Sequence, residues 1–250
     1  MGHVEGGAAA VVDAFLDVLG PAGTLVVPTF TFTHGRSDNS VFDPARDPSE
    51  MGRISEVTRT RTGARRSCHL LHSVAALGKH AGEIAAVHGP SAWAADGPFW
   101  KLHEVDAQIL LLGVPYLRCT YFHLLEQLVQ VPYRRWREVK ARVRAQDGSL
   151  QPLPTLVYSP GPGFVGNDFN KLGNLLEERG LARVGSVGNA VARLFRARDA
   201  FEHGLAQYRQ DRQLFLLTGE RCTPLRDGVL TDELNNEKSV VDPAFIYRRQ

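Results

Sequence analysis

The sequence predicts an α/β fold in which a mixed sheet is flanked by helices. Segments with helical spacing of apolar residues alternate with β-branched runs in the first half of the chain, whereas residues 136–159 resemble a pair of antiparallel strands. This order of elements is typical of a mixed α/β domain. At 250 residues, with 43% apolar and 22% charged residues, the chain is an ordinary globular protein that can build a core around a catalytic cleft.

The first elements are a helix over residues 7–19 and a strand over residues 24–32. Val12, Phe15 and Leu19 fall on one helix face, and the sequence GPAG ends the helix. The run TLVVPTFTF is rich in β-branched and aromatic residues, which predicts a buried strand. A helix followed by a turn and a strand is the second half of a βαβ unit, whose first strand would precede residue 1.

The middle of the chain combines long loops with short elements. We expect a polar loop over 33–52, a helix over 53–61, a loop or strand edge over 67–77, a short helix over 80–88 and a second buried strand over 107–114. A loop as long as the first of these is often functional in a compact domain.

The second half begins with a hairpin and ends in a polar segment. We expect a helix over 168–180, a segment over 181–195 that starts extended and becomes helical, and a helix over 197–211. Residues 218–250 are polar without a lasting period, which indicates a surface extension. The predicted organisation is therefore one domain over residues 1–217 and an extension over 218–250.

Charge and cysteine content exclude several classes of protein. A net charge of +2 gives no reason to expect nucleic acid or a membrane as partner, and no apolar stretch reaches the length of a membrane span. The basic run over residues 134–144 is better explained as a solvated face than as a phosphate site. Three scattered cysteines and the absence of a signal peptide favour the reducing cytoplasm, and no motif with metal-ligand spacing occurs.

The stretch LLLGVPYLRCTYFHLLEQ, residues 110–127, is the strongest candidate for chemistry. Ligands of α/β sheets usually bind beyond the carboxyl ends of strands, where this loop and helix would lie. Thr120 is a candidate N-cap, and a helix N-terminus next to His123 would favour the neutral imidazole that a general base requires. Glu126 could fix the tautomer of that ring, receive its proton or hold a cationic substrate.

Other residues allow competing interpretations. Cys119 near a histidine could be a thiol nucleophile, but a small buried side chain is the simpler explanation. His69 and His72 have only a loose metal spacing and no third ligand in reach, so a loop with one histidine facing a cleft is preferred. A serine hydrolase would need a GxSxG elbow, which HSVAA and SVGNA do not provide.

The ordered set of motifs resembles the aminoglycoside 3-N-acetyltransferase family. It comprises LGPAGTLVVPTFTF, FDPARDPSEMGRISE, RRSCHLLHSVAALGKHA, FWKLHEVDAQILLLGV, CTYFHLLEQ, VPYR, DFNKLG and VGSVGNAVARLF, and it extends from about residue 4 to residue 216. The resemblance implies a three-layer α/β sandwich distinct from the GNAT acetyltransferases. It also implies direct transfer of an acetyl group from acetyl-CoA to an amine of an aminocyclitol antibiotic, without a metal.

The resemblance assigns roles to individual residues. The matching T-x-x-H-x-x-E motif makes His123 the general base, with Thr120 and Glu126 as its companions. The expected acetyl-CoA contacts are Thr29, His72, Ser73 and Thr120, and the acids expected to bind a cationic amine are Asp43, Asp96, Glu126 and Asp168. The expected partner is this small-molecule amine, and a homodimer is possible.

Two departures from the family pattern keep alternatives open. Family members usually carry a further helix and a strand with a Ser-rich loop before the segment that starts here, so either the start codon is placed too late or the protein has lost part of its acetyl-CoA site. Leu70 also stands where the family commonly has proline. Leucine lacks the backbone constraint that proline would impose on this loop, which lies near the thioester in the family. The alternatives are a biosynthetic acyltransferase with another acyl donor and a non-catalytic relative that binds a ligand or a partner.

Overall fold

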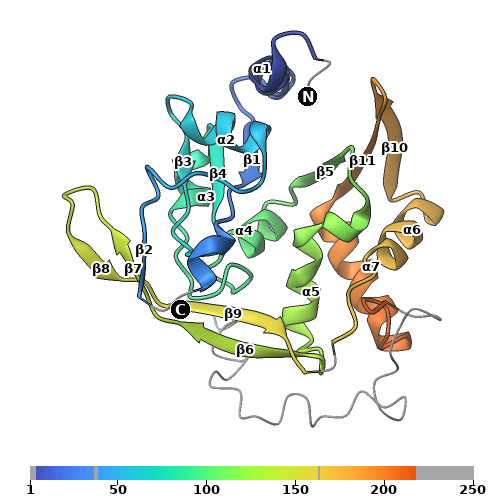
Figure 1. Ribbon diagram of the computed structural model, residues 1–250. Helices are drawn as coiled ribbons and strands as arrows, with labels where there is room; N and C mark the ends of the chain where they lie inside the picture. The colour runs from blue at the N-terminus through green and yellow to red at the C-terminus, as the bar shows by residue number, and fades with distance from the viewer. Residues whose placement is uncertain (1–3, 37–38, 163, 218–250) are drawn as a thin grey trace. The chain divides into compact units, whose positions relative to one another are not determined.

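The computed structural model describes residues 4–36, 39–162 and 164–217, which form two compact units (Figure 1). Of the described residues, the first unit contains those up to 101 and 137–157, and the second contains 102–136 and 158–217. Each unit combines helices with strands, so the predicted α/β class is confirmed. The predicted extension over 218–250 lies outside the described residues, and the single domain over 1–217 stays a prediction.

The first unit is built on a three-stranded antiparallel sheet in the order β1-β4-β3. Its strands are β1 (Thr24–Pro28), β3 (Arg65–Arg66) and β4 (Val74–Gly78), and its helices are α1 (Gly7–Leu19), α2 (Arg53–Thr60) and α3 (Ala81–Ala85). The three helices that the sequence predicts here are confirmed, and α2 and α3 lie beside the sheet in Figure 1. The first strand is shorter than predicted, since it ends at Pro28 and the chain then forms the 3₁₀ helix η1 (Phe32–Arg36).

A second sheet in the first unit joins the long polar loop to the predicted hairpin. Strand β2 (Ser40–Phe42) runs parallel to β7 (Ala141–Arg144), which pairs antiparallel with β8 (Leu150–Pro152). A further two-stranded sheet consists of β6 (Arg134–Val139) and β9 (Thr155–Pro160), so the predicted pair of strands is confirmed. The core beside these strands contains Phe42, Leu70, Leu71, Val139, Leu153 and Val157.

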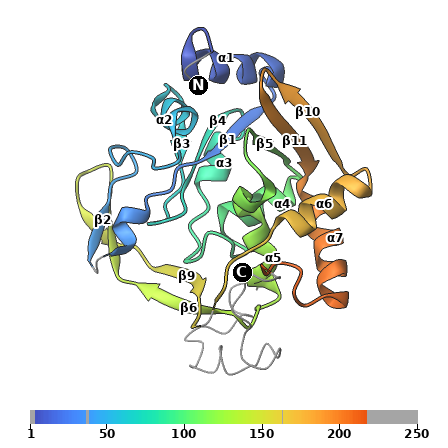
Figure 2. The same cartoon turned by 45° about the vertical axis from the view of Figure 1, so that its right-hand side comes forward.

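The second unit contains an antiparallel sheet in the order β10-β11-β5. Its elements are β5 (Gln108–Leu112), β10 (Ala182–Val187), β11 (Ala190–Arg196), α6 (Asn170–Glu178) and α7 (Ala197–Gln210), while α4 (Pro98–Glu104) crosses the boundary between the units. Helices α6 and α7 pack next to this sheet, as Figure 2 shows. Both helices are confirmed where the sequence predicts them.

Two predictions about this sheet need correction. Residues 181–195 do not become helical, because they form the hairpin β10–β11, in which Gly188 at φ 57° makes the turn. The strand predicted at 107–114 exists but is not buried throughout, since Leu110 is 38% exposed. Among the described strands β5 has one neighbour, β11, and therefore lies at an edge of its sheet.

Candidate active site

The chain reaches the candidate site through three short helices that follow β5 in the second unit. These are the 3₁₀ helices η2 (Tyr116–Arg118) and η3 (Thr120–Phe122) and the helix α5 (His123–Leu128). The predicted N-cap role of Thr120 is wrong, because α5 begins three residues later, at His123, and Thr120 instead opens η3. Since η3 continues directly into α5, Thr120, His123 and Glu126 still follow one another at intervals of about one turn.

His123 and Glu126 form a close pair with unequal exposure. Nδ1 of His123 lies 2.5 Å from Oε2 of Glu126, and the imidazole side chain is 27% exposed while the carboxylate is fully buried. A carboxylate that accepts the Nδ1 proton leaves the lone pair of the neutral ring on Nε2. Complete burial of Glu126 argues against the alternative in which this carboxylate directly holds a cationic substrate.

Three further polar groups surround the Glu126 carboxylate. The hydroxyl of Tyr133 donates to Oε1 at 2.9 Å, and Nδ2 of Asn167 donates to the same oxygen at 2.6 Å. Nε of Arg134 lies 2.9 Å from Oε2 and completes an ion pair. This Nε–H finds no aligned acceptor among the described residues, so the contact is an ion pair rather than a directed hydrogen bond. The carboxylate thus has two partners on each oxygen, which is what a buried charge requires.

Arg134 is itself held from several sides. It donates from Nη1 to the carbonyl of Tyr158 at 3.1 Å and from Nη2 to Oδ1 of Asn167 at 2.7 Å. Its guanidinium also stacks over the ring of Phe164 at 5.3 Å. The prediction of a solvated face for residues 134–144 is therefore wrong at this residue, which is buried because it neutralises Glu126.

The electrostatics of the pair favour a neutral base beside an ionised carboxylate. Burial lowers the pKa of His123, and this effect exceeds the opposite effect of Glu126. Burial by itself would raise the pKa of Glu126, but His123, Arg134 and Tyr133 outweigh it and hold that pKa below its usual range. The sequence therefore predicts the neutral imidazole correctly but for another reason: burial, rather than a helix terminus, lowers the histidine pKa.

An aromatic ring fixes the other side of His123. The ring of Phe169 meets the imidazole edge-on, with centroids 4.9 Å apart at an interplanar angle of 70°. Glu126 and Phe169 together restrict rotation of the imidazole, while the exposed part of its side chain can still meet a ligand.

The thiol alternative at Cys119 is wrong. This side chain is 1% exposed, and burial raises its pKa to about 12. A thiol with so high a pKa stays protonated near pH 7 and is not a nucleophile.

Two of the expected acetyl-CoA contacts, Thr29 and Ser73, are buried in the first unit. Their hydroxyls lie 3.0 Å apart, and Nε of Arg66 donates to both, at 3.1 and 3.0 Å. Burial lowers the pKa of Arg66 to about 10, so this guanidinium remains charged at neutral pH. The hydroxyls already serve this internal network, and a direct contact with acetyl-CoA stays a prediction.

The two loop histidines also belong to the first unit. His72 is half-buried among Phe30, Phe32 and Trp93, with ring centroids 5.1, 5.6 and 4.7 Å away. His69 is buried, its Nδ1 accepts the backbone N–H of His72 at 3.0 Å, and burial lowers its pKa to about 4. Among the described residues there is no group of three histidine, cysteine, aspartate or glutamate side chains that could hold a metal ion.

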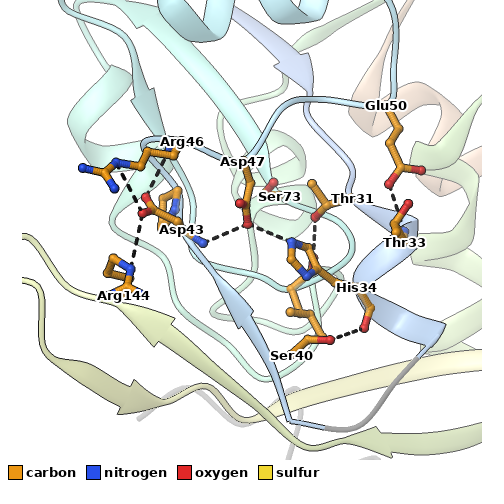
Figure 3. A network of polar contacts seen from close by, with 12 residues as sticks. Thr31, Thr33, His34, Ser40, Asp43, Arg46, Asp47, Glu50, Ser73 and Arg144 are labelled. Carbon is orange, nitrogen blue, oxygen red and sulfur yellow. Dashed lines mark hydrogen bonds and ion pairs between the residues drawn. The ribbon is translucent and has the colours of Figure 1, made fainter.

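The expected substrate-binding acids belong to both units. Asp43 accepts the backbone N–H groups of Ala45 and Arg46 through Oδ1 and faces Arg144 with Oδ2 at 3.6 Å (Figure 3). Asp96 is exposed in the same unit. Asp168 is half-buried in the second unit, and its Oδ1 accepts the backbone N–H of Asn170 at 3.2 Å.

Four residues that complete the environment of Glu126 and His123 are not among the sequence-predicted site residues. These are Tyr133, Arg134, Asn167 and Phe169. The segment VPYR contains two of them and belongs to the motifs quoted above, but no periodicity or spacing connects it with Glu126. Asn167 carries no local signal of this kind.

Comparison with known proteins gives a consistent assignment. A family model described as aminoglycoside 3-N-acetyltransferase matches residues 1–209. Aminoglycoside N(3)-acetyltransferase IV from Salmonella sp is 32% identical over 85% of this chain and 78% of its own length. Aminoglycoside N(3)-acetyltransferase VII from Streptomyces paromomycinus is 30% identical over 82% of this chain and 81% of its own length.

Solved structures with similar folds include aminoglycoside acetyltransferases. The apoenzyme of aminoglycoside acetyltransferase AAC(3)-IVa superposes with a TM-score of 0.69 at 32% identity, covering 88% of this chain and 82% of that one. A histidine-to-alanine mutant of AAC(3)-IVa in complex with apramycin gives a TM-score of 0.67 at 30% identity, with 84% and 81% of the two chains covered. The described part of the chain contains no helix with the length and apolar character that a membrane crossing needs.

Proposed function

The chain belongs to the aminoglycoside 3-N-acetyltransferase family, and we propose that His123 is the general base of its reaction. The chain is an N-acetyltransferase that moves an acetyl group from acetyl-CoA to an amine of an aminoglycoside or related aminocyclitol. The observation that carries the role of His123 is its 2.5 Å contact with a fully buried carboxylate. The choice of a histidine is supported by a relative, AAC(3)-IVa, that was solved with apramycin as a histidine-to-alanine mutant.

The proposed chemistry begins with a neutral amine, whose nitrogen must give up a proton as it bonds to the thioester carbonyl carbon. Glu126 accepts a hydrogen bond from Nδ1–H of His123, so the lone pair of the neutral imidazole is on Nε2, which faces the amine. Nε2 takes a proton as the amine nitrogen bonds to the thioester carbonyl carbon. When the carbon–sulfur bond breaks, the imidazolium returns that proton to the departing thiolate of CoA. General base catalysis of this kind contributes about 10²–10⁴-fold in rate.

Thr120 is the proposed donor for the negative charge that develops on the thioester oxygen. It lies one turn before His123, and its side chain is half-buried. A hydroxyl that donates a hydrogen bond to a developing oxyanion stabilises the transition state more than the ground state. In this mechanism the acetyl group passes directly from CoA to the amine.

The remaining predicted contacts are part of the same proposal. We assign acetyl-CoA binding to Thr29, His72, Ser73 and Thr120, and binding of the cationic amine to Asp43, Asp96 and Asp168. Asp168 is supported best, because it belongs to the same unit as His123 and follows Asn167 directly. Glu126 is assigned to His123 alone, since three hydrogen-bond donors and the ion pair with Arg134 already satisfy it.

The compartment and the assembly state complete the proposal. A cytoplasmic enzyme fits three scattered cysteines, of which Cys68 and Cys119 are free thiols in the structure. A homodimer is the assembly that we propose, because two-fold dimers are by far the commonest soluble oligomers. Cell fractionation tests the first statement, and light scattering of the purified chain tests the second.

The test of the function is CoA release with acetyl-CoA and a panel of aminoglycosides and other amines, followed with a thiol reagent. We expect release with an aminoglycoside and its loss in His123→Ala, whereas His80→Ala, a replacement at another histidine near a glutamate, should leave it unchanged. No release by the wild-type chain with any acyl-CoA would contradict the proposal. Release with a different acyl-CoA alone would favour the biosynthetic alternative.

A further inference from the structure

Asn167 makes three polar contacts with its side-chain amide at the candidate site. Its Nδ2 donates to Oε1 of Glu126 at 2.6 Å and to the carbonyl of Phe215 at 3.2 Å, and its Oδ1 accepts from Nη2 of Arg134 at 2.7 Å. The two acceptors on one side and the donor on the other determine the orientation of the amide.

These contacts close a ring around two buried charges. Arg134 lies 2.9 Å from Oε2 of Glu126, while Asn167 contacts both of these residues. Oε2 faces His123 and Arg134, and Oε1 faces Tyr133 and Asn167. Without Asn167, Oε1 would keep Tyr133 as its donor, and Arg134 would lose one of the contacts that aim it at the carboxylate.

The backbone on both sides of Asn167 is held by the last described residues of the chain. Asn167 forms an antiparallel bridge with Leu216, and the N–H of Asp168 donates to the carbonyl of Phe215 at 2.9 Å. The N–H of Leu217 donates to the carbonyl of Gly166 at 3.0 Å. Phe215 is fully buried, so this segment, which follows the part matched by the family model, is a fixed support.

We propose that Asn167 is a positioning residue that acts on His123 through Glu126 and Arg134. The inference rests on the proposed function of His123 as the base. Asn167 stabilises the ionised form of Glu126 and keeps Arg134 beside it, and both effects set the orientation and basicity of the imidazole. Asn167 itself touches neither the amine nor the thioester in this account.

Asn167→Asp is the decisive variant because it has nearly the same shape. The new carboxylate would keep the acceptor for Arg134 but would place a second negative oxygen against Oε1 of Glu126. Two carboxylates this close share one proton, so one of their pKa values rises strongly. Below that raised pKa the shared proton restores a donor to Glu126, and above it the donor is lost.

We therefore expect the kcat of Asn167→Asp, divided by that of the wild type, to fall by about tenfold or more between about pH 6 and about pH 9. Asn167→Ala should lose about 10–100-fold in kcat, the effect of one hydrogen bond to a charged group, with both KM values within about twofold. Asn167→Ser, which keeps one hydroxyl donor, should retain more activity than Asn167→Ala. Asn174→Ala, an exposed asparagine on α6, is the matched control.

If the kcat of Asn167→Asp is reduced but its ratio to the wild-type kcat stays constant with pH, the inference is overturned. A merely structural role would not change with the protonation of the two carboxylates. Full activity of Asn167→Ala would also overturn it. If Asn167→Asp does not fold, the order of Asn167→Ser and Asn167→Ala decides instead. Failure of the underlying function is distinguishable: the wild type would then release no CoA, or His123→Ala would remain active.

Discussion

The chain contains two histidine–glutamate pairs with the same spacing of three residues, His80–Glu83 and His123–Glu126. In the first pair Nδ1 of the histidine lies 3.1 Å from the carboxylate, and the side chains are 46% and 63% exposed. In the second pair the distance is 2.5 Å, and the exposures are 27% and 0%. The first pair stands at the start of α3 and the second at the start of α5.

The comparison shows that a spacing of three residues brings the two side chains into contact, whereas burial determines the charge state and chemical role of the pair. Water competes for both partners of His80–Glu83 and screens their charges, so such a pair has little effect on stability. The buried carboxylate of Glu126 instead needs Tyr133, Arg134 and Asn167 to remain ionised. These neighbours convert a common surface pattern into a candidate catalytic one.

The largest contrast should appear in activity when each glutamate is made neutral. Glu126→Gln keeps the shape of the side chain but removes the charge that fixes the His123 tautomer, so we expect kcat to fall by about 10²–10³-fold. Glu83→Gln should leave kcat within about twofold of the wild type. Steady-state kinetics with acetyl-CoA and a responsive aminoglycoside measure both. Equal losses in the two variants would remove the distinction between the pairs.

The second contrast concerns the free energy of unfolding. Glu126→Ala leaves the buried charge of Arg134 without its carboxylate, which we expect to cost about 3–5 kcal/mol. Glu83→Ala on the exposed pair should not change the unfolding free energy measurably. Urea denaturation followed by circular dichroism measures both, and a cost below about 1 kcal/mol for Glu126→Ala would mean that Arg134 finds water or another partner.

The third contrast concerns the dependence of stability on pH. Because burial holds the folded-state pKa of His123 below its unfolded value of about 6.5, the unfolded state binds more protons once the pH falls below that value, and stability declines. His123→Gln removes this contribution, so its loss of stability between about pH 7 and about pH 5 should be smaller than in the wild type.

The effect of Glu126 on stability falls at lower pH, and His80→Gln provides a control. Glu126, whose folded pKa is depressed, adds a loss of stability at lower pH, below its unfolded value of about 4.5, and therefore does not act in this window. His80→Gln on the exposed pair serves as control and should follow the wild-type curve. If His123→Gln shows the same dependence of the unfolding free energy on pH as the wild type, the imidazole of His123 does not contribute to that dependence.

The smallest expected effect is the position of the acid limb of the kcat/KM profile. A base whose pKa is lowered by burial stays neutral further into acid, so the limb should lie below about pH 6.5 in the wild type. Phe169→Leu, which loosens the packing against the imidazole, should admit water and move the limb toward about pH 6.5. A limb above that value in the wild type would mean that Glu126 outweighs burial.

From the sequence alone follow the local elements with a strong period and the candidate pair His123 and Glu126. The helices at 7–19, 53–61 and 197–211 follow from the spacing of apolar residues, because an amphipathic helix must bury one face wherever it packs. The position of Thr120, His123 and Glu126 just beyond a strand, together with the family motif, pointed to the candidate base, and the spacing of three residues brings neighbours one turn apart into contact.

Tertiary structure alone decided what lies around that pair. The hairpin at 182–196 replaced an expected helix because pairing with β5 satisfies its backbone and overrides local preference. Asn167 reaches Glu126 across 41 residues and Arg134 across 33. Such contacts depend on how distant segments pack, and that packing gives one of two identical His-x-x-Glu patterns a buried, fully paired carboxylate while it leaves the other in water.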